Sequence, residues 1–117
     1  MSPHDHRATD PPAALGACVT AGMSDRVVAR ATGARPDAVR DWIDGRATPA
    51  PGEAERLSAL ASIAERLTPL VKRGHLVAWL ATANPTLGGD APLDCIAADD
   101  HRAVAKLVSG LEDPGAS

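Results

Sequence analysis

The chain has 117 residues, of which 44% are hydrophobic and only 2% aromatic, and its formal net charge is −3. This length allows one domain, or two subdomains that share a core. The negative net charge excludes a protein that coats nucleic acid non-specifically. It does not exclude a protein that binds a specific DNA sequence, because such binding depends on the charge of the contacting surface alone. Because the chain has no Phe or Tyr, Ala, Leu and Val must fill the core, which favours packed helices over sheets.

The cysteines and apolar runs narrow the class of protein further. Cys18 and Cys95 are too few and too far apart to indicate a metal site or a disulfide scaffold. No apolar run approaches the length of a membrane span, and the first residues lack the hydrophobic region of a signal peptide. We therefore expect a protein of the reducing cytoplasm with no membrane partner.

The first part of the chain, residues 1–12, is polar and rich in proline, which is typical of a disordered arm. Two imidazoles in this arm, at His4 and His6, flank Asp5, but a metal site needs a further ligand that the arm does not offer. Residues 13–21 then predict a short apolar helix that ends at Gly22.

The next stretch has the pattern of two short helices joined by a tight turn. Ser24 is expected to cap the first helix, and Gly33 supplies the backbone freedom needed at the corner. The second helix covers residues 35–44, with Val39 and Trp42 on its buried face. This pattern predicts a helix-turn-helix whose second helix is the recognition helix.

Candidate DNA contacts lie at the outward positions of that second helix. The guanidinium of Arg40 suits a bidentate contact with guanine, while Arg26 and Arg30 lie where they could contact phosphates. The complete set of candidate DNA-contacting residues is Arg35, Asp37, Arg40, Asp41 and Arg46. Because acidic residues nearly balance the arginines here, a second interpretation stays open: a structural or dimerisation module with a solvated charged face.

A long helix is expected after the stiff connector at residues 46–51. Its apolar stripe consists of Leu57, Leu60, Ala61, Ala64 and Leu67. Pro69 and Gly74 predict a break between this helix and another over residues 75–83.

The remaining elements complete an all-α prediction. A short helix follows Pro92, and Asp99 or Asp100 is expected to cap a final helix. The apolar stripe of that final helix consists of Val104, Leu107, Val108 and Leu111. No segment has the pattern of a strand, so we expect a small helical bundle, with a helix-turn-helix domain at 13–51 and a second helical domain at 52–117.

The turn from Asn84 to Pro92 is the candidate partner surface. Its prolines and glycines fix an exposed backbone shape at little entropic cost on binding, and nine residues are many for a simple connector. Leu87 is the expected apolar contact, and a plain helix connector is the alternative. Trp79, just before the turn, is either a core residue or an interface anchor.

Catalytic sites are not indicated. His75 and His101 lie on separate predicted helices with no carboxylate or nucleophile at catalytic spacing. The two cysteines have apolar neighbours and suit small core positions. Gly88 and Gly89 lack the following Lys-Ser or Lys-Thr of a phosphate loop. We expect no enzyme activity, no cofactor and no metal.

Two parts of the chain resemble one family. The helix-turn-helix resembles the Xre type. The second part resembles the toxin-binding domain of the Xre/MbcA/ParS antitoxins in a series of short motifs: Trp79-Leu80, Asn84-Pro85, Leu87-Gly88-Gly89 and Pro92-Leu93-Asp94, then Val104 and Leu107. Together the two parts cover residues 13–111, and their order in so short a chain is more specific than the helix-turn-helix alone.

This resemblance implies an antitoxin whose partner is a RES-domain toxin that consumes NAD or transfers ADP-ribose from it. It implies a homodimer that covers the active-site cleft of the toxin and that represses its own operon by binding operator DNA. The residues that it assigns to toxin binding are Trp79, Asn84, Pro85, Leu87, Gly88, Gly89, Pro92, Leu93 and Asp94.

Two departures from the family pattern concern the blocking contacts. The final segment is short and ends in Asp-Pro-Gly-Ala-Ser, so we expect only a limited C-terminal peptide that could enter the active site of the toxin. The second departure is Ala98-Asp99-Asp100, at a place where the family commonly has a glycine. The acidic residues expected to pair with basic groups of the toxin are Asp90, Asp94, Asp99 and Asp100. Two alternatives remain: a stand-alone Xre-type regulator whose C-terminal half only dimerises, and an assembly adaptor without DNA binding.

Overall fold

The structure is a computed structural model that describes residues 10–113, and in this range it contains helices and no strand. The elements in chain order are α1 (Pro11–Thr20), α2 (Asp25–Thr32), α3 (Pro36–Ile43), α4 (Pro51–Leu67), the 3-10 helix η2 (Arg73–His75), α5 (Leu76–Ala81), the 3-10 helix η3 (Pro85–Leu87), α6 (Pro92–Ala97) and α7 (His101–Glu112). The all-α prediction is therefore confirmed. None of these helices combines the length and apolar character needed to cross a bilayer.

Local sequence explains where most of the helices begin. Proline occupies the first turn of α1, α3, α4 and α6, where its missing N–H costs no helical hydrogen bond. Ser24 caps α2, because its Oγ accepts a hydrogen bond from the Val27 N–H at 3.3 Å. Glu53 tightens the start of α4 by accepting a hydrogen bond from the Ala50 N–H at 2.9 Å.

Gly33 explains the sharp end of α2. Its φ of +80° lies in the left-handed region, which residues with a Cβ adopt only at a cost. Its N–H donates to the Ala29 carbonyl at 2.9 Å, which closes the last turn of the helix. The chain then enters α3 after only three residues, as the helix-turn-helix prediction requires.

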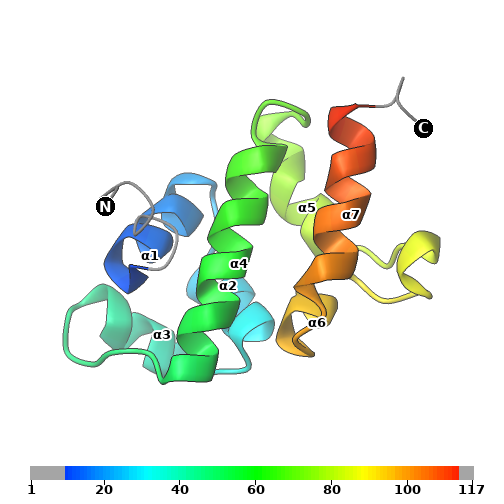
Figure 1. The fold of residues 1–117 in the computed structure, drawn as a ribbon. Coiled ribbons are helices and arrows are strands. Elements are labelled where there is room, and N and C mark those ends of the chain that lie inside the picture. The colour runs from blue at the N-terminus through cyan, green and yellow to red at the C-terminus, as the bar shows by residue number, and fades with distance from the viewer. Residues whose placement is uncertain (1–9, 114–117) are drawn as a thin grey trace, which may run out of the picture.

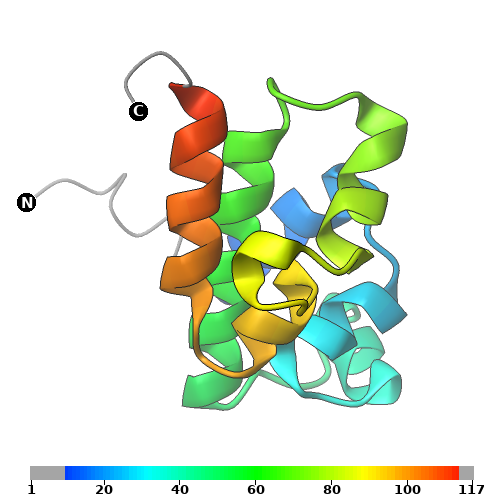
Figure 2. The same ribbon diagram turned by 90° about the vertical axis from the view of Figure 1, so that its right-hand side faces the viewer.

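Helix α4 lies at the centre of the fold (Figure 1). It contacts α1 on one side and α2, α6 and α7 on the other, and α2 also contacts both α3 and α6. Figure 2 shows the side of the molecule on which α7 and the turn with η3 lie. The N-terminal and C-terminal halves of the chain therefore pack against each other around one helix.

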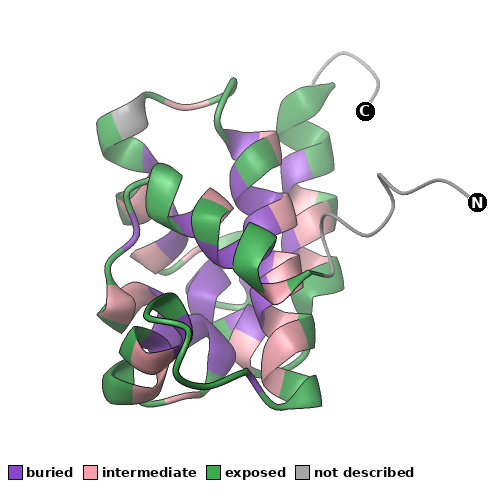
Figure 3. Cartoon of the chain, turned by 90° about the vertical axis from the view of Figure 1, so that its left-hand side faces the viewer, coloured by how far each residue is buried: buried purple, intermediate pink, exposed green. Residues whose placement is uncertain are grey.

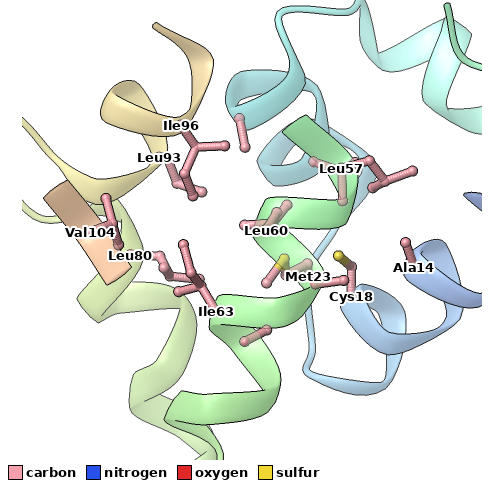
Figure 4. Close-up of a cluster of buried hydrophobic side chains, with 14 of the residues drawn as sticks. Ala14, Cys18, Met23, Leu57, Leu60, Ile63, Leu80, Leu93, Ile96 and Val104 are labelled. Atoms are coloured by element: carbon pink, nitrogen blue, oxygen red, sulfur yellow. The ribbon is translucent and has the colours of Figure 1, made fainter. Parts of the chain in front are cut away.

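The core is one continuous group of buried side chains (purple in Figure 3) that includes residues of both halves. On one side of α4, Leu60 and Ile63 lie near Leu93 and Ile96 of α6 (Figure 4). Cys18 lies on the other side of α4 in the same view. All five residues of the predicted α4 stripe are at most 2% exposed, so that prediction is confirmed.

Two predicted boundaries in the N-terminal half and at α5 differ from the structure. Residues 11 and 12, expected in a disordered arm, form the first turn of α1, because proline is accepted there. The helix expected over 75–83 is a 3-10 turn followed by α5, which ends at Ala81. Thr82 is extended, with a φ of −97° and a ψ of 135°, so the helix does not continue to Ala83. His4, Asp5 and His6 lie outside the described residues.

The start and end of α7 also differ from the prediction. Asp100 occupies the N-cap position, but its side chain forms no capping hydrogen bond. Val104 and Val108 of the predicted stripe are fully buried, whereas Leu111 is 42% exposed because the last turn extends past the core.

Candidate functional site

The segment predicted to be a helix-turn-helix, α2 with α3, presents one face of α3 to solvent. α2 and α3 pack against each other, and Val39 and Trp42 on the inner face of α3 are at most 7% exposed. The predicted core position of Trp42 is confirmed. The outer face of α3 is therefore the face that another molecule can reach.

Side chains of both charges occupy this outer face. Arg35, Asp37, Arg40 and Arg46 are exposed, and Asp41 is half-buried. Arg40 Nη2 lies 3.5 Å from Asp25 Oδ2, yet the Arg40 side chain is 67% exposed, so this ion pair constrains it little. All five candidate DNA-contacting residues lie on α3 or beside its ends, and DNA contact stays a prediction.

The side chain of Arg30 points toward α6 and forms an ion pair with Asp94 of that helix. Its Nε and Nη2 donate to the two carboxylate oxygens of Asp94 at 2.9 and 2.8 Å. These hydrogen bonds raise the pKa of Arg30 and lower the pKa of Asp94. From the sequence, Arg30 was expected to contact DNA phosphates and Asp94 to lie in the partner surface. In the structure these two residues form an ion pair with each other.

The turn from Asn84 to Asp90 is closed by its own hydrogen bonds. Asn84 Oδ1 accepts from the Thr86 N–H at 2.9 Å, and the Asn84 carbonyl accepts from the Gly89 N–H at 3.0 Å. The Asn84 N–H donates in turn to the Asp90 carbonyl at 3.0 Å. Gly88 has a φ of +72°, which allows the backbone to reverse after η3. The turn is a shaped surface element rather than a loose connector.

The nine residues assigned to partner binding divide into an exposed and a buried group. The exposed or half-buried residues are Trp79, Asn84, Pro85, Gly88, Gly89 and Asp94. The buried residues are Leu87, Pro92 and Leu93. The Leu87 side chain is only 9% exposed and packs with the core, so it offers little apolar surface to a partner, and its role as the apolar contact of the turn stays a prediction.

A shallow hollow lies beside the half-buried Trp79. It has a volume of about 290 Å³ and is open to solvent. The residues that line it are His75, Ala78, Trp79, Thr82, Ala83 and Asn84. Sequence reasoning named Trp79 and Asn84 but missed the others, although the spacing of His75, Trp79 and Thr82 at i, i+4 and i+7 places them on one helix face.

The four acidic residues of the C-terminal half have different surroundings. Asp94 pairs with Arg30, and Asp99 accepts a hydrogen bond from Arg56 Nε at 2.9 Å. Among the side chains that the structure describes, Asp90 and Asp100 have no ion-pair partner within 4 Å. Two of the four carboxylates expected to meet basic groups of a partner therefore lie outside the described ion pairs, and two are engaged within the chain.

The thiols are protonated at neutral pH. Burial, with a smaller effect of Glu65, raises the pKa of Cys18 to about 12. Burial also raises the pKa of Cys95, and the nearby carboxylates of Asp90, Asp100 and Asp94 add to that effect. Neither thiol has the lowered pKa of a nucleophile, so both serve as the small core residues that the sequence predicted. The described residues contain no group of three or more metal-ligating side chains.

Comparison with known proteins gives one informative result. No family model matches the chain, and no curated protein matches it. A chain in the crystal structure of the M. tuberculosis MbcT–MbcA toxin–antitoxin complex has the same fold, with a TM-score of 0.76 and 21% sequence identity. The match covers 98% of each of the two chains. The fold is thus the one found in a protein of a toxin–antitoxin complex, which agrees with the family resemblance of the motifs.

Proposed function

We propose that this protein is the antitoxin of a two-gene toxin–antitoxin system. The observation that carries the proposal is the fold shared with a chain of the MbcT–MbcA complex over 98% of both chains. The motif series from Trp79 to Asp94 supports the same function independently, because it resembles the toxin-binding domain of these antitoxins. At 21% identity the match establishes the fold, and the function is our inference from it.

The proposed mechanism is steric, with the C-terminal half covering the active-site cleft of a RES-domain toxin and so blocking access of NAD. Three features of this half support such a surface: the half-buried Trp79 beside its hollow, the closed turn at 84–90, and the exposed carboxylates of Asp90 and Asp100, which lie outside the ion pairs that the structure describes. A rigid turn loses little entropy on binding. Carboxylates at this surface match the basic groups that a dinucleotide-binding cleft offers to phosphates.

The buried residues of the motif have a supporting role in this proposal. Leu87, Pro92 and Leu93 are at most 9% exposed, so they anchor the turn and α6 to the core. The ion pairs Arg30–Asp94 and Arg56–Asp99 hold α6 and the segment after it against α2 and α4. We infer that Asp94 and Asp99 orient the surface, whereas Asp90 and Asp100 contact the toxin.

A stand-alone transcription regulator is the second candidate, and the exposed Arg35 and Arg40 on α3 favour it. The two functions coexist if the antitoxin represses its own operon. DNA binding through few phosphate contacts is expected to be weak at physiological salt and to strengthen as salt is lowered. A band shift with the upstream DNA of its own gene, at two salt concentrations, tests this part separately.

The first experiment is co-expression with the product of the adjacent open reading frame, followed by pull-down and measurement of cellular NAD. We expect a stable complex and preserved NAD. No complex, together with an NAD level that the neighbouring protein does not change, would refute the antitoxin proposal and favour the regulator.

Charge reversal then tests the assignment of the carboxylates. The variant Asp90→Lys with Asp100→Lys should weaken the complex at least about tenfold, since each contact of this kind typically contributes more than 1 kcal/mol when buried in an interface. The matched control, Asp37→Lys with Asp44→Lys, reverses two exposed carboxylates, one on α3 and one at its C-cap. Equal affinity of the two variants would contradict the proposed role of Asp90 and Asp100.

A further inference from the structure

Asp99 has a backbone conformation that is unusual for a residue with a side chain. Its φ is +65°, in the left-handed region, and in residues 10–113 no other residue except glycine has a positive φ. The Asp100 N–H donates to the Cys95 carbonyl at 2.8 Å, and the Asp99 N–H donates to the Ile96 carbonyl at 3.0 Å. These two hydrogen bonds form the Schellman motif that ends a helix, in which glycine is the usual left-handed residue. Asp99 therefore needs support that a glycine would not need.

Arg56 of α4 supplies this support. Its Nε donates to Asp99 Oδ1 at 2.9 Å and its Nη2 donates to Asp99 Oδ2 at 3.2 Å, so both carboxylate oxygens are held. A bidentate contact of this kind fixes direction as well as distance. The Arg56 side chain is only 26% exposed, so the surrounding chain covers most of it. The guanidinium thus holds Asp99 at the point where the backbone turns from α6 toward α7.

The same guanidinium also binds the end of α2. Arg56 Nη1 donates to the Thr32 carbonyl at 2.9 Å. The Thr32 carbonyl and the Gly33 N–H belong to one peptide group, and this N–H closes the last turn of α2 by donating to the Ala29 carbonyl. A Cβ at Gly33 would lie 3.4 Å from Arg56 Nη1, so the guanidinium lies directly against this corner. A cation here also suits the negative end of the helix dipole.

We propose that Arg56 is a positioning residue that fixes two corners of the chain at once, the turn at Gly33 and the turn at Asp99. The first turn leads into α3, and the second carries Asp100, which the antitoxin proposal places against the toxin. The role of Arg56 in toxin binding rests on that proposed function. Because one side chain holds both corners, a change at one corner should alter the other.

The geometry of arginine is essential to this role. A guanidinium carries its N–H donors in a flat fork, and Arg56 directs Nε, Nη1 and Nη2 to acceptors that follow two different helices. A lysine ammonium has the same charge, but it is a compact donor on a flexible stem. The variant Arg56→Lys therefore preserves the charge of the chain and removes the geometry that joins the two corners.

Amide hydrogen exchange, measured by NMR on the full chain without toxin or DNA, tests both corners. We expect Arg56→Lys to speed exchange of the Gly33 and Asp100 N–H groups at least about threefold, because charge-assisted hydrogen bonds that hold both turns are lost. The matched control, Arg66→Lys, breaks a similar bidentate contact between α4 and Glu112. This control should leave both rates unchanged. An unchanged rate at either corner in Arg56→Lys would overturn the proposal.

The variant Asp99→Gly tests the link between the corners. Glycine adopts a φ of +65° without support, so the Asp100 N–H should keep its exchange rate in this variant. The Gly33 N–H should nevertheless exchange at least about twofold faster, since Arg56 has lost the carboxylate that orients it. An unchanged rate at Gly33 would show that the two corners are independent, which contradicts the proposal.

Capture of the toxin by the same variants tests the consequence for binding. Arg56→Lys should weaken the complex at least about threefold, because Asp100 is no longer held in one position before binding. Adding Asp99→Gly to this variant should restore the affinity to within about twofold, since glycine closes the turn unaided. The Gly33 N–H should still exchange fast in the double variant. This difference distinguishes restored positioning of Asp100 from a general gain in stability.

The outcomes separate this proposal from the antitoxin proposal. Hydrogen exchange requires no partner, so the exchange rates decide whether Arg56 joins the two corners even if the unsubstituted chain captures no toxin. Failure of that capture would refute the antitoxin function. Faster exchange in Arg56→Lys with undiminished capture of the toxin would instead refute the role of Arg56 in positioning Asp100 for binding.

Discussion

Substitution of Leu93 tests whether the Pro92-Leu93-Asp94 motif stabilises the fold or contacts the toxin directly. The motif was assigned to toxin binding, yet the Leu93 side chain is fully buried in α6, beside Ile96 and facing Leu60 of α4 (Figure 4). Leu93→Ala removes three buried carbon atoms. Substitutions of this kind cost about 2–5 kcal/mol, because a cavity adds to the lost transfer free energy.

The expected cost for Leu93→Ala is about 3 kcal/mol. The short helix α6 is held by α2, α4, α5 and α7, so the chain around Leu93 collapses only in part and a cavity remains. A domain of this size unfolds at a cost of about 5–15 kcal/mol. The variant therefore stays folded at 25 °C, and its surface stays available for binding measurements.

Urea unfolding measures this cost. With a slope of about 2 kcal/mol/M, the midpoint should fall by about 1.5 M. Leu111→Ala is the matched control, since it removes the same atoms from a side chain that is 42% exposed, and it should change the free energy of unfolding by less than about 0.5 kcal/mol. Toxin binding by folded Leu93→Ala should be close to that of the unsubstituted chain. An unchanged midpoint together with lost binding would show that Leu93 contacts the toxin, and the reasoning from its burial would be refuted.

Three further predictions concern the thiols, the turn and the acid stability. Because burial raises the pKa of Cys18 to about 12, a thiol reagent at pH 8 should label it only after unfolding, and rapid labelling of the native chain, located by peptide mapping, would contradict its burial. Gly33→Ala should cost about 1–2 kcal/mol in urea unfolding, since Gly33 has a φ of +80°; no change would mean that the turn relaxes. Three carboxylates have pKa values that are lower in the folded state than their usual 3.8 or 4.5: Asp94, Asp99 and Glu112. Their stabilising effect is complete above those usual values and is lost as the pH falls through the lower folded values. The triple variant Asp94→Asn, Asp99→Asn and Glu112→Gln should therefore show a smaller fall in Tm between pH 5 and pH 2 than the unsubstituted chain. An equal fall in Tm for both proteins would refute the role of these ion pairs.

Local sequence by itself determined the helices and most of their ends. Ser24 and Gly33 bound α2 because a hydroxyl and a missing Cβ act on the neighbouring backbone, whatever the rest of the chain does. The stripe on α4 was predictable for a similar reason, since residues three and four apart share one face of a helix. The all-α class followed from these local rules and from the scarcity of aromatic residues.

The motif series that indicated an antitoxin was also visible in the sequence alone. Short motifs such as Asn84-Pro85 and Gly88-Gly89 set the backbone locally, so their resemblance to a family survives at low overall identity. Their order along the chain pointed to the fold that the MbcT–MbcA comparison bears out.

Only the tertiary structure decided which residues of the motif are buried and which are exposed. Leu87 and Leu93 are apolar residues near a turn, and periodicity alone does not distinguish a core position from an interface position, because both bury apolar surface. The pairing of Arg30 with Asp94 joins residues 64 positions apart, and no local rule relates them. A groove that lies between α1 and α4 likewise exists only because α4 passes beside α1 after the chain has turned three times. Long-range packing therefore determined which charges of the described residues are paired within the chain and which of their faces are exposed.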